Sequence, residues 1–499
     1  MLDTSIEMTV FICYNTNMRT LFKKTFILLC CIYALAITAI LRADFNYIDD
    51  MGRVLSGYKG WSFYSRFTTD FLSGIVHAGN YLSDISPLPQ LLAVIIVALS
   101  GALIVEILAD EGCSPIWGAI AMIPLGLSPY FLQCFSYKYD SPYMALSILF
   151  SVLPVFVFSK YKKKYKYIIY VISVIVAMLL VCTTYQAATG IFPMLVIALS
   201  LKMWNENELF SDIVKFAALS VVGYLAALLI FRFFIVVPVD FYASTDIVPI
   251  SDLIPSLIKN FKTYFSVIYL DFRKLWLVVI AAICVLFVLA NVLCSKRSKV
   301  AALVVSVIAL ILMLLVSFGA YIALAKPLFD PRGMYGFGAF VAIISVFVVC
   351  INKKVFNCSK ICCLILGWLF IVFSFNYGNA LSQQKEYTDF RITQVISSLN
   401  SLDIMTNGEE KIIEISGTIG YAPPVENQPS QYRMLRNLVP VLFSEDRSWG
   451  YTMLLNYYGL TDLKQDSSCD LKSQDLPVLV DNQLHTIKGN ESEILIILK

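Results

Sequence analysis

Histidine is almost absent from this chain, and charged residues are scarce. The 499 residues include two histidines, and Asp, Glu, Lys and Arg together make up 15% of the sequence. Without a cluster of His and Cys residues, a zinc site is not expected. We predict no cofactor. A divalent cation bound by carboxylates alone is the one alternative that the composition leaves open.

A nucleotide-binding glycine loop is absent too, and the polar C-terminal part has no strained turn that carries a nucleophilic serine. Nucleotide ligands are commonly held by the backbone amides of such a glycine loop. We therefore expect no nucleotide site of this kind. We also expect no nucleic-acid partner. The net charge of +3 says little about partners.

Hydrophobic residues are abundant instead. They make up 58% of the chain, and the mean hydropathy is +0.74. Soluble domains are only about 45–50% apolar. Most of the thirteen cysteines lie in apolar runs, where they behave as small hydrophobic residues. The composition predicts an α-helical polytopic protein of the lipid bilayer.

About eleven apolar segments have the length of membrane spans. They lie near residues 24–42, 88–109, 115–134, 142–159, 167–185, 188–203, 213–237, 275–294, 300–324, 336–352 and 361–376. Basic clusters at 160–166, 296–299 and 353–354 each follow an even-numbered segment. The positive-inside rule puts these clusters and the N-terminus, residues 1–23, in the cytoplasm. The odd number of spans then puts the C-terminus on the opposite side.

This topology divides the chain into a membrane domain, residues 24–376, and an outward tail, residues 377–499. Within the first outer loop, residues 43–87, the stretch 63–81 has roughly helical spacing and suits an interfacial helix. The tail alternates strand and helix patterns and predicts a small α/β domain. We expect its strands at 411–415, 476–480 and 493–498, and its helices near 382–402, 430–443 and 449–458.

The pair Asp49 and Asp50 is the leading candidate for catalysis. Two carboxylates at the lip of a span are costly unless water, cations or a reaction partner reach them. One of them is suited to act as a general base toward an attacking hydroxyl. We favour Asp50 slightly, because a helical turn would place it on one face with Arg53. The alternative is a solvated loop at a helix end.

Three further outward segments carry candidate ligands. In the second loop Lys138 suits a phosphate, Tyr139 suits stacking on a sugar and Asp140 suits sugar hydroxyls, although an aromatic belt explains the tyrosines equally. Gln186 belongs to a polar cluster that lines a cavity or joins helices. The forked donors of Arg332 suit a phosphate oxygen, or a salt bridge to Asp330.

Arg232 is a separate candidate, because it lies inside an apolar run. An intramembrane arginine marks a functional site by default. The alternative is that its side chain snorkels to the outer interface.

Several of these segments resemble one family. They are Tyr47 to Arg53, Gly57 to Trp61 with Arg66, Ile85 to Gln90, Tyr139 to Leu146, and Tyr185 to Ala187. They are similar to the O-antigen glucosyltransferases of bacteria and prophages that change serotype. The resemblance covers most of the membrane region, and the first loop is its most specific part.

The resemblance implies a GT-C-like fold in the bacterial inner membrane, with chemistry on the periplasmic face. It implies undecaprenyl-phosphate glucose as donor and lipid-linked O-antigen as acceptor. A polyprenyl-phosphate glucosyl synthase and a flippase would be functional partners. The acidic pair occupies the place where such enzymes keep their catalytic carboxylate.

The resulting site prediction has three groups. They are Asp49 and Asp50 for catalysis; Arg53, Lys138, Arg332 and Arg66 for the donor phosphate; and Tyr58, Lys59, Trp61, Tyr139, Asp140 and Gln186 for sugar and acceptor. The alternatives are a transporter or flippase of lipid-linked sugars, a polymerase or ligase, and a non-catalytic membrane protein. Visible repeats or several charged spans would favour transport, and neither is present.

Overall fold

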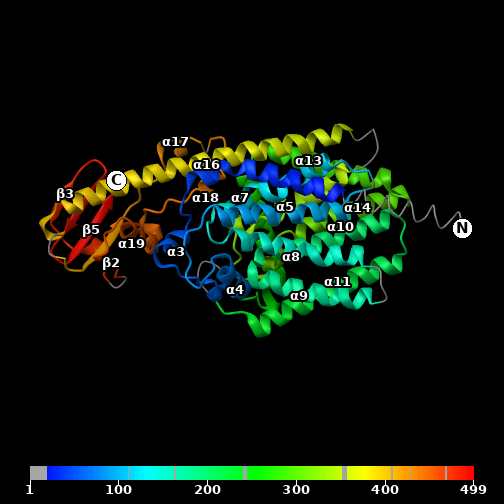
Figure 1. Ribbon diagram of the computed structural model, residues 1–499, viewed down its shortest axis with the longest axis horizontal. Helices are drawn as coiled ribbons and strands as arrows, with labels where there is room; N and C mark the ends of the chain where they lie inside the picture. The colour runs from blue at the N-terminus through cyan, green and yellow to red at the C-terminus, as the bar shows by residue number, and fades with distance from the viewer. Residues whose placement is uncertain are drawn as a thin grey trace.

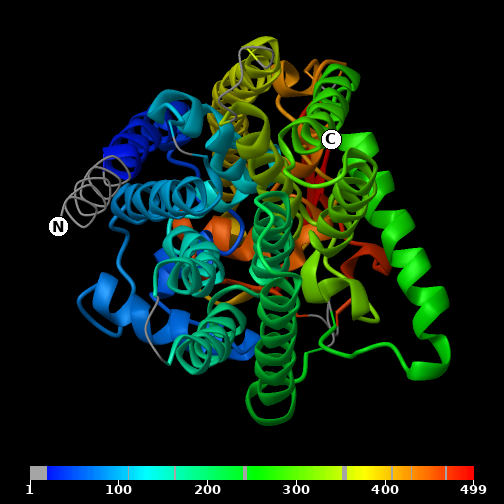
Figure 2. The ribbon, with the colours of Figure 1, turned by 90° about the vertical axis from the view of Figure 1, so that its right-hand side faces the viewer.

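The chain forms an elongated molecule, with a helical bundle at one end and a small sheet at the other (Figure 1). The computed structural model describes residues 20–110, 112–161, 165–239, 244–350, 357–405, 408–428, 430–466 and 469–499. Of the basic clusters, Lys162 to Lys164 and Lys353 to Lys354 lie outside these ranges. Viewed along the bundle, the helices appear end-on and the sheet lies behind them (Figure 2).

The bundle confirms the prediction of a polytopic helical membrane protein. Nine of the described helices are long and apolar enough to cross a membrane, and a bent pair brings the number to ten. The nine begin with the helix Thr20–Ala43, whose last part is α2 (Thr38–Ala43), and continue with α5 (Leu88–Leu108), α8 (Ser141–Lys160), α9 (Lys166–Thr184), α10 (Ile191–Asn205) preceded by η2 (Gln186–Gly190), α11 (Phe210–Ile230) followed by η3 (Phe231–Ile235), α13 (Lys274–Cys294), α14 (Lys299–Val316) and α16 (Asn357–Asn400).

Two of the eleven predicted spans differ from a simple crossing. The third is the bent pair α6 (Pro115–Leu127) and α7 (Pro129–Ser136), whose axes differ by 65°. Ser128 is extended there, because the residue before a proline is disfavoured in a helix. The tenth is α15 (Gly336–Val349), which has 14 residues and is almost completely buried.

Elements from the outer loops cover the end of the bundle that faces the sheet, and Figure 1 shows two helices of the first loop there. These elements are α3 (Asp50–Ser56), η1 (Trp61–Tyr64) and α4 (Phe67–Val76) from the first loop, with η4 (Ile250–Asp252), α12 (Leu253–Asp271), η5 (Gly319–Ala323) and η6 (Pro331–Gly333) from later loops. In α4 the side chains of Phe67, Phe71 and Ile75 follow one face and are exposed. This apolar stripe suits the interfacial helix expected in the first loop.

The opposite end of the bundle carries the basic residues. Lys160 ends α8 and pairs with Glu106 at 2.8 Å, and the Lys202 ammonium donates to the Ala109 carbonyl. The Lys296 backbone amide donates to the Asn205 carbonyl and the Arg297 side chain donates to the Trp204 carbonyl, both at the end of α10. Because α8 has 20 residues, about 30 Å separate this basic end from Asp140 at the start of the helix.

Helix α16 joins the bundle to the C-terminal part. It continues without interruption through residue 377, where the sequence suggested a domain boundary, and its second half is the helix expected at 382–402. Beyond it the five strands are ordered β2-β1-β5-β4-β3. Their bounds are β1 Lys411–Ser416, β2 Leu463–Lys464, β3 Val478–Asp481, β4 His485–Gly489 and β5 Glu493–Leu498. β1 is parallel to β2 and β5, and the other pairs are antiparallel.

One helix expected in the tail does not form. Residues 430–443 contain only the single turn α18 (Leu435–Leu438). Pro440 cannot continue a helix, and the Leu438 carbonyl accepts hydrogen bonds from Tyr47 and Tyr377 of the bundle. The remaining helices are η8 (Asp403–Met405), α17 (Pro423–Glu426), η9 (Glu445–Arg447), α19 (Ser448–Tyr457) and η10 (Leu471–Ser473), and α19 lies close to its expected place.

Candidate active site

Asp50 begins α3 and is completely buried. Its Oδ2 accepts hydrogen bonds from the backbone amides of Tyr47 at 3.1 Å and Lys138 at 2.9 Å. Burial raises the pKa of the Asp50 carboxyl from 3.8 to about 8, although the nearby Arg53 acts in the other direction. Through its two backbone hydrogen bonds Asp50 joins the first two outer loops.

Arg53 lies at the centre of a buried ion-pair network. The predicted helical turn brings its guanidinium to 4.0 Å from Asp50, but its closest partner is Asp140, which it contacts directly. The Trp61 indole nitrogen donates to the other Asp140 oxygen at 2.6 Å, and the guanidinium lies 4.5 Å from the Trp61 ring. Three residues predicted from separate positions in two loops thus meet in one cluster.

Lys138 is neutralised in a similar way. Its ammonium lies 2.5 Å from Asp44, which is largely exposed, and 3.3 Å from Asp84, which is about one third exposed. Because Arg53 and Lys138 are already compensated by carboxylates, neither presents an unopposed charge to a phosphate.

Asp49 differs from Asp50 in its accessibility. Its side chain is 42% exposed, and its carboxylate lies 3.8 Å from the Arg332 guanidinium. Arg332 also lies 3.9 Å from Asp330, so the predicted alternative of a salt bridge between them is met as well. A group that takes a proton from a substrate must reach it, so exposure favours Asp49 over Asp50, against the preference drawn from the sequence.

An aromatic and amide network fixes Arg332. Its Nη1 donates to the Tyr137 hydroxyl at 2.6 Å, and its backbone amide donates to the Gln133 side chain at 2.5 Å. Gln133 in turn donates to the Tyr47 hydroxyl, which donates to the Leu438 carbonyl of the C-terminal part. The C-terminal part thereby contributes directly to the support of the site.

The other predicted residues divide between the cluster and its surroundings. Tyr58 is exposed beside Arg53, with its ring 6.0 Å from the guanidinium, whereas Tyr139 is buried and stacks on His77. Lys59 points away from the cluster and donates to the Asp70 carbonyl and to Asn80. Arg66 and Gln186 line a separate cavity between helices.

Sequence reasoning did not assign roles to Asp44, Asp84 or Tyr137. Each binds a predicted cation, Lys138 or Arg332. Asp44 and Asp84 lie near the two ends of the first outer loop, so their position beside two spans was a usable signal. Tyr137 precedes Lys138 and was available as one of the loop's aromatic residues.

No group of three or more His, Cys, Asp or Glu side chains within the described ranges is arranged to hold a metal ion. The carboxylates near Asp49 are instead interleaved with Arg and Lys side chains. The expectation that catalysis needs no metal stays a prediction.

Comparisons with known proteins identify the family of the chain. The family model of glucosyl transferase GtrII matches residues 38–343, which include the whole acidic and basic cluster. A protein of Salmonella phage P22, described as an uncharacterized 55.3 kDa protein in the gtrB 5' region, is 28% identical over 459 residues, or 88% of this chain and 90% of the relative. No solved structure matches the chain. Because the family model covers more than half of its length, the chain belongs to the glucosyl transferase GtrII family.

Proposed function

We propose that this glucosyltransferase moves glucose from undecaprenyl-phosphate glucose to lipid-linked O-antigen on the periplasmic face of the bacterial inner membrane. The observation that carries the proposal is the accessible Asp49 carboxylate, which lies beside Arg332. The ion pair of Arg53 and Asp140 in the same cluster is buried and balanced in charge. The relative lies in a phage gtrB region, which accords with a role in modifying O-antigen. The N-terminus then faces the cytoplasm and the C-terminal sheet faces the periplasm.

Asp49 is the general base of the proposed reaction. It removes the proton of an acceptor hydroxyl, whose oxygen forms a bond to the anomeric carbon of glucose. The bond from that carbon to the phosphate oxygen breaks, and the polyprenyl phosphate leaves with the electron pair. This single displacement inverts the anomeric configuration and needs one base and no second carboxylic acid.

Arg332 and Asp50 position the base in this mechanism. Arg332 is held by Tyr137 and by the Gln133 side chain, so its charge is fixed beside Asp49. Asp50 ties the backbone at residues 47 and 138 together and so fixes the start of α3. Tyr58 is the exposed aromatic residue beside this base and is suited to stack on a sugar ring.

The proposed partners are the donor and acceptor lipids, with a polyprenyl-phosphate glucosyl synthase and a flippase that deliver the donor to the outer face. The basic residues at the far end of the bundle, Lys160, Lys202 and Lys296 among them, support a cytoplasmic location for that end.

Comparison of O-antigen composition and linkage with and without the gene, by mass spectrometry and NMR, tests the proposed function. We expect a glucose branch that disappears with the gene. The purified protein should transfer glucose from polyprenyl-phosphate glucose and not from UDP-glucose. Turnover with UDP-glucose alone would contradict the proposed donor.

A further inference from the structure

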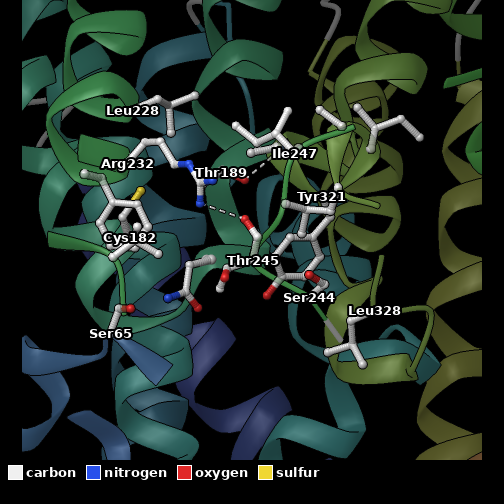
Figure 3. A pocket seen from close by; sticks show the side chains of 18 of the residues that line it. Ser65, Cys182, Thr189, Leu228, Arg232, Ser244, Thr245, Ile247, Tyr321 and Leu328 are labelled. Carbon is white, nitrogen blue, oxygen red and sulfur yellow. Dashed lines mark hydrogen bonds between the residues drawn. The ribbon is translucent and has the colours of Figure 1, made fainter. Parts of the chain in front are cut away.

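A continuous apolar groove, distinct from the charged cluster, runs along α11 between α10 and α14. Two cavities form it, one of about 530 Å³ near the outer end and one of about 510 Å³ further along. Pro193, Tyr224 and Val316 line both cavities, so the two adjoin. Figure 3 shows the outer cavity, with Leu228 and Cys182 on one wall and Ile247 and Tyr321 on the other.

The groove is as long as a bilayer is thick. On α11 and η3 its lining extends from Phe210 to Arg232, which is about 33 Å at the helical rise of about 1.5 Å per residue. The hydrocarbon core of a bilayer measures about 30 Å. A chain that fills the groove therefore passes through both leaflets, whereas the acyl chain of a phospholipid reaches through one.

Two arginines stand at the outer end of the groove. Arg232 extends between the walls and donates to the Thr245 carbonyl at 3.0 Å (Figure 3). It belongs to the π-helical segment η3, and such segments are frequent at functional sites. Arg66 lines the same cavity, and its guanidinium lies 4.5 Å from the ring of Tyr185. The combination of a long apolar groove and a cationic end is complementary to a long-chain lipid phosphate.

The cationic end adjoins the candidate active site. Tyr185 contacts Arg66 on one side and faces the ring of Tyr335 at 6.1 Å, and Tyr335 lies three residues after Arg332 in the chain. A phosphate held at Arg66 and Arg232 is thus on the side of the bundle that leads to Arg332 and Asp49.

We propose that this groove binds the isoprenoid tail of the polyprenyl-phosphate donor and that Arg232 binds its phosphate together with Arg66. The inference rests on the proposed function, which supplies the polyprenyl-phosphate donor. We assign the groove to this donor and not to the acceptor for the following reason. The acceptor reacts through a sugar that need not lie near its own lipid phosphate. A phosphate leaving group, by contrast, must remain beside the reacting carbon, where cations stabilise it.

The groove is tested by narrowing it on α11. Ala217 lines the groove, and its neighbour Ala218 is exposed on the outside of the same helix. Ala217→Phe should raise the KM for a donor with eleven isoprene units about tenfold or more, and leave the KM for a donor with two units unchanged. Ala218→Phe is the matched control and should behave like the wild type with both donors.

The phosphate contact is tested at Arg232. Arg232→Gln should raise the KM for both donors about 10- to 100-fold, the size expected for a lost charge-assisted hydrogen bond. Arg232→Lys should restore part of the affinity, because it keeps the charge. Amount and size-exclusion behaviour of each purified variant serve as the check on folding.

Binding without turnover separates this inference from the proposed function. A photoreactive undecaprenyl phosphate without sugar should label α11 and α14 in the wild type and lose that labelling in Ala217→Phe. Labelling together with absent glucose transfer would overturn the proposed function and keep the groove. Normal glucose transfer with unchanged labelling and KM in Ala217→Phe would overturn the groove, as would equal competition by phosphatidylglycerol.

Discussion

Arg332 places its guanidinium 3.8 Å from the Asp49 carboxylate while it donates to the Tyr137 hydroxyl at 2.6 Å. This arrangement fixes a cation beside the one member of the acidic pair that is accessible. If Arg332 positions Asp49, Arg332→Gln should lower the rate of glucose transfer about 10- to 100-fold. Asp330→Asn, which removes the other carboxylate near Arg332, should change the rate little. Equal losses in both variants would contradict the positioning role.

The buried Asp50 makes stability depend on pH. Its pKa is about 8 in the folded protein, against an ordinary value of 3.8, so between these values the folded state binds more protons than the unfolded state. The free energy of unfolding therefore falls as pH rises through this window. Asp50→Asn should weaken the fall in thermal unfolding temperature between pH 5 and pH 8. A fall as steep as that of the wild type would show that Asp50 does not cause it.

Because Arg53 and Asp140 are buried in contact, removal of Asp140 alone should destabilise the protein more than removal of both side chains. Asp140→Ala leaves a buried guanidinium without its closest carboxylate, which costs roughly 3–5 kcal/mol. The additional change Arg53→Met should recover part of this loss. Trp61→Phe removes the indole hydrogen bond to Asp140 and shortens the buried ring beside Arg53, and it should cost less than Asp140→Ala, about 1–3 kcal/mol. Thermal unfolding in detergent measures the stability of the wild type and the three variants.

The distribution of basic residues predicts the orientation in the membrane. A reporter fused at Ser298, beside Arg297 at the basic end, should be cytoplasmic. Reporters at Ser382 in α16 or after Lys499 should be periplasmic. A cytoplasmic C-terminus would overturn both the topology and the outer-face location of Asp49.

The sequence predicted the helices and longer strands of this fold better than the places where they bend, end or continue. Long apolar runs indicate spans wherever they occur, and each of the eleven expected segments contains a helix. The bend at Ser128 had a local signal in Pro129, which a count of apolar runs does not use. The continuation of α16 through residue 377 depends on packing against other helices, which a local pattern does not contain. Strands β2 and β4 were missed, because β2 has two residues and β4, from His485 to Gly489, contains a single apolar residue, Ile487.

The residues of the candidate site could be predicted from the sequence, but the contacts between them could not. The first and second loops were correctly singled out as sources of charged and aromatic residues. The sequence could not show that Asp140 would contact Arg53, 87 residues away. It also could not show that one residue's difference in position would bury Asp50 and expose Asp49, because burial is set by the C-terminal part and the second loop.

The most direct test of the account is the rate of glucose transfer from polyprenyl-phosphate glucose by purified Asp49→Asn, measured beside Asp50→Asn and the wild type. Loss of a general base typically lowers the rate about 10²–10⁴-fold. We expect that loss for Asp49→Asn at unchanged protein level, and a smaller one for Asp50→Asn, since asparagine can still accept the two backbone hydrogen bonds. A wild-type rate in Asp49→Asn would contradict the assignment of Asp49 as the base.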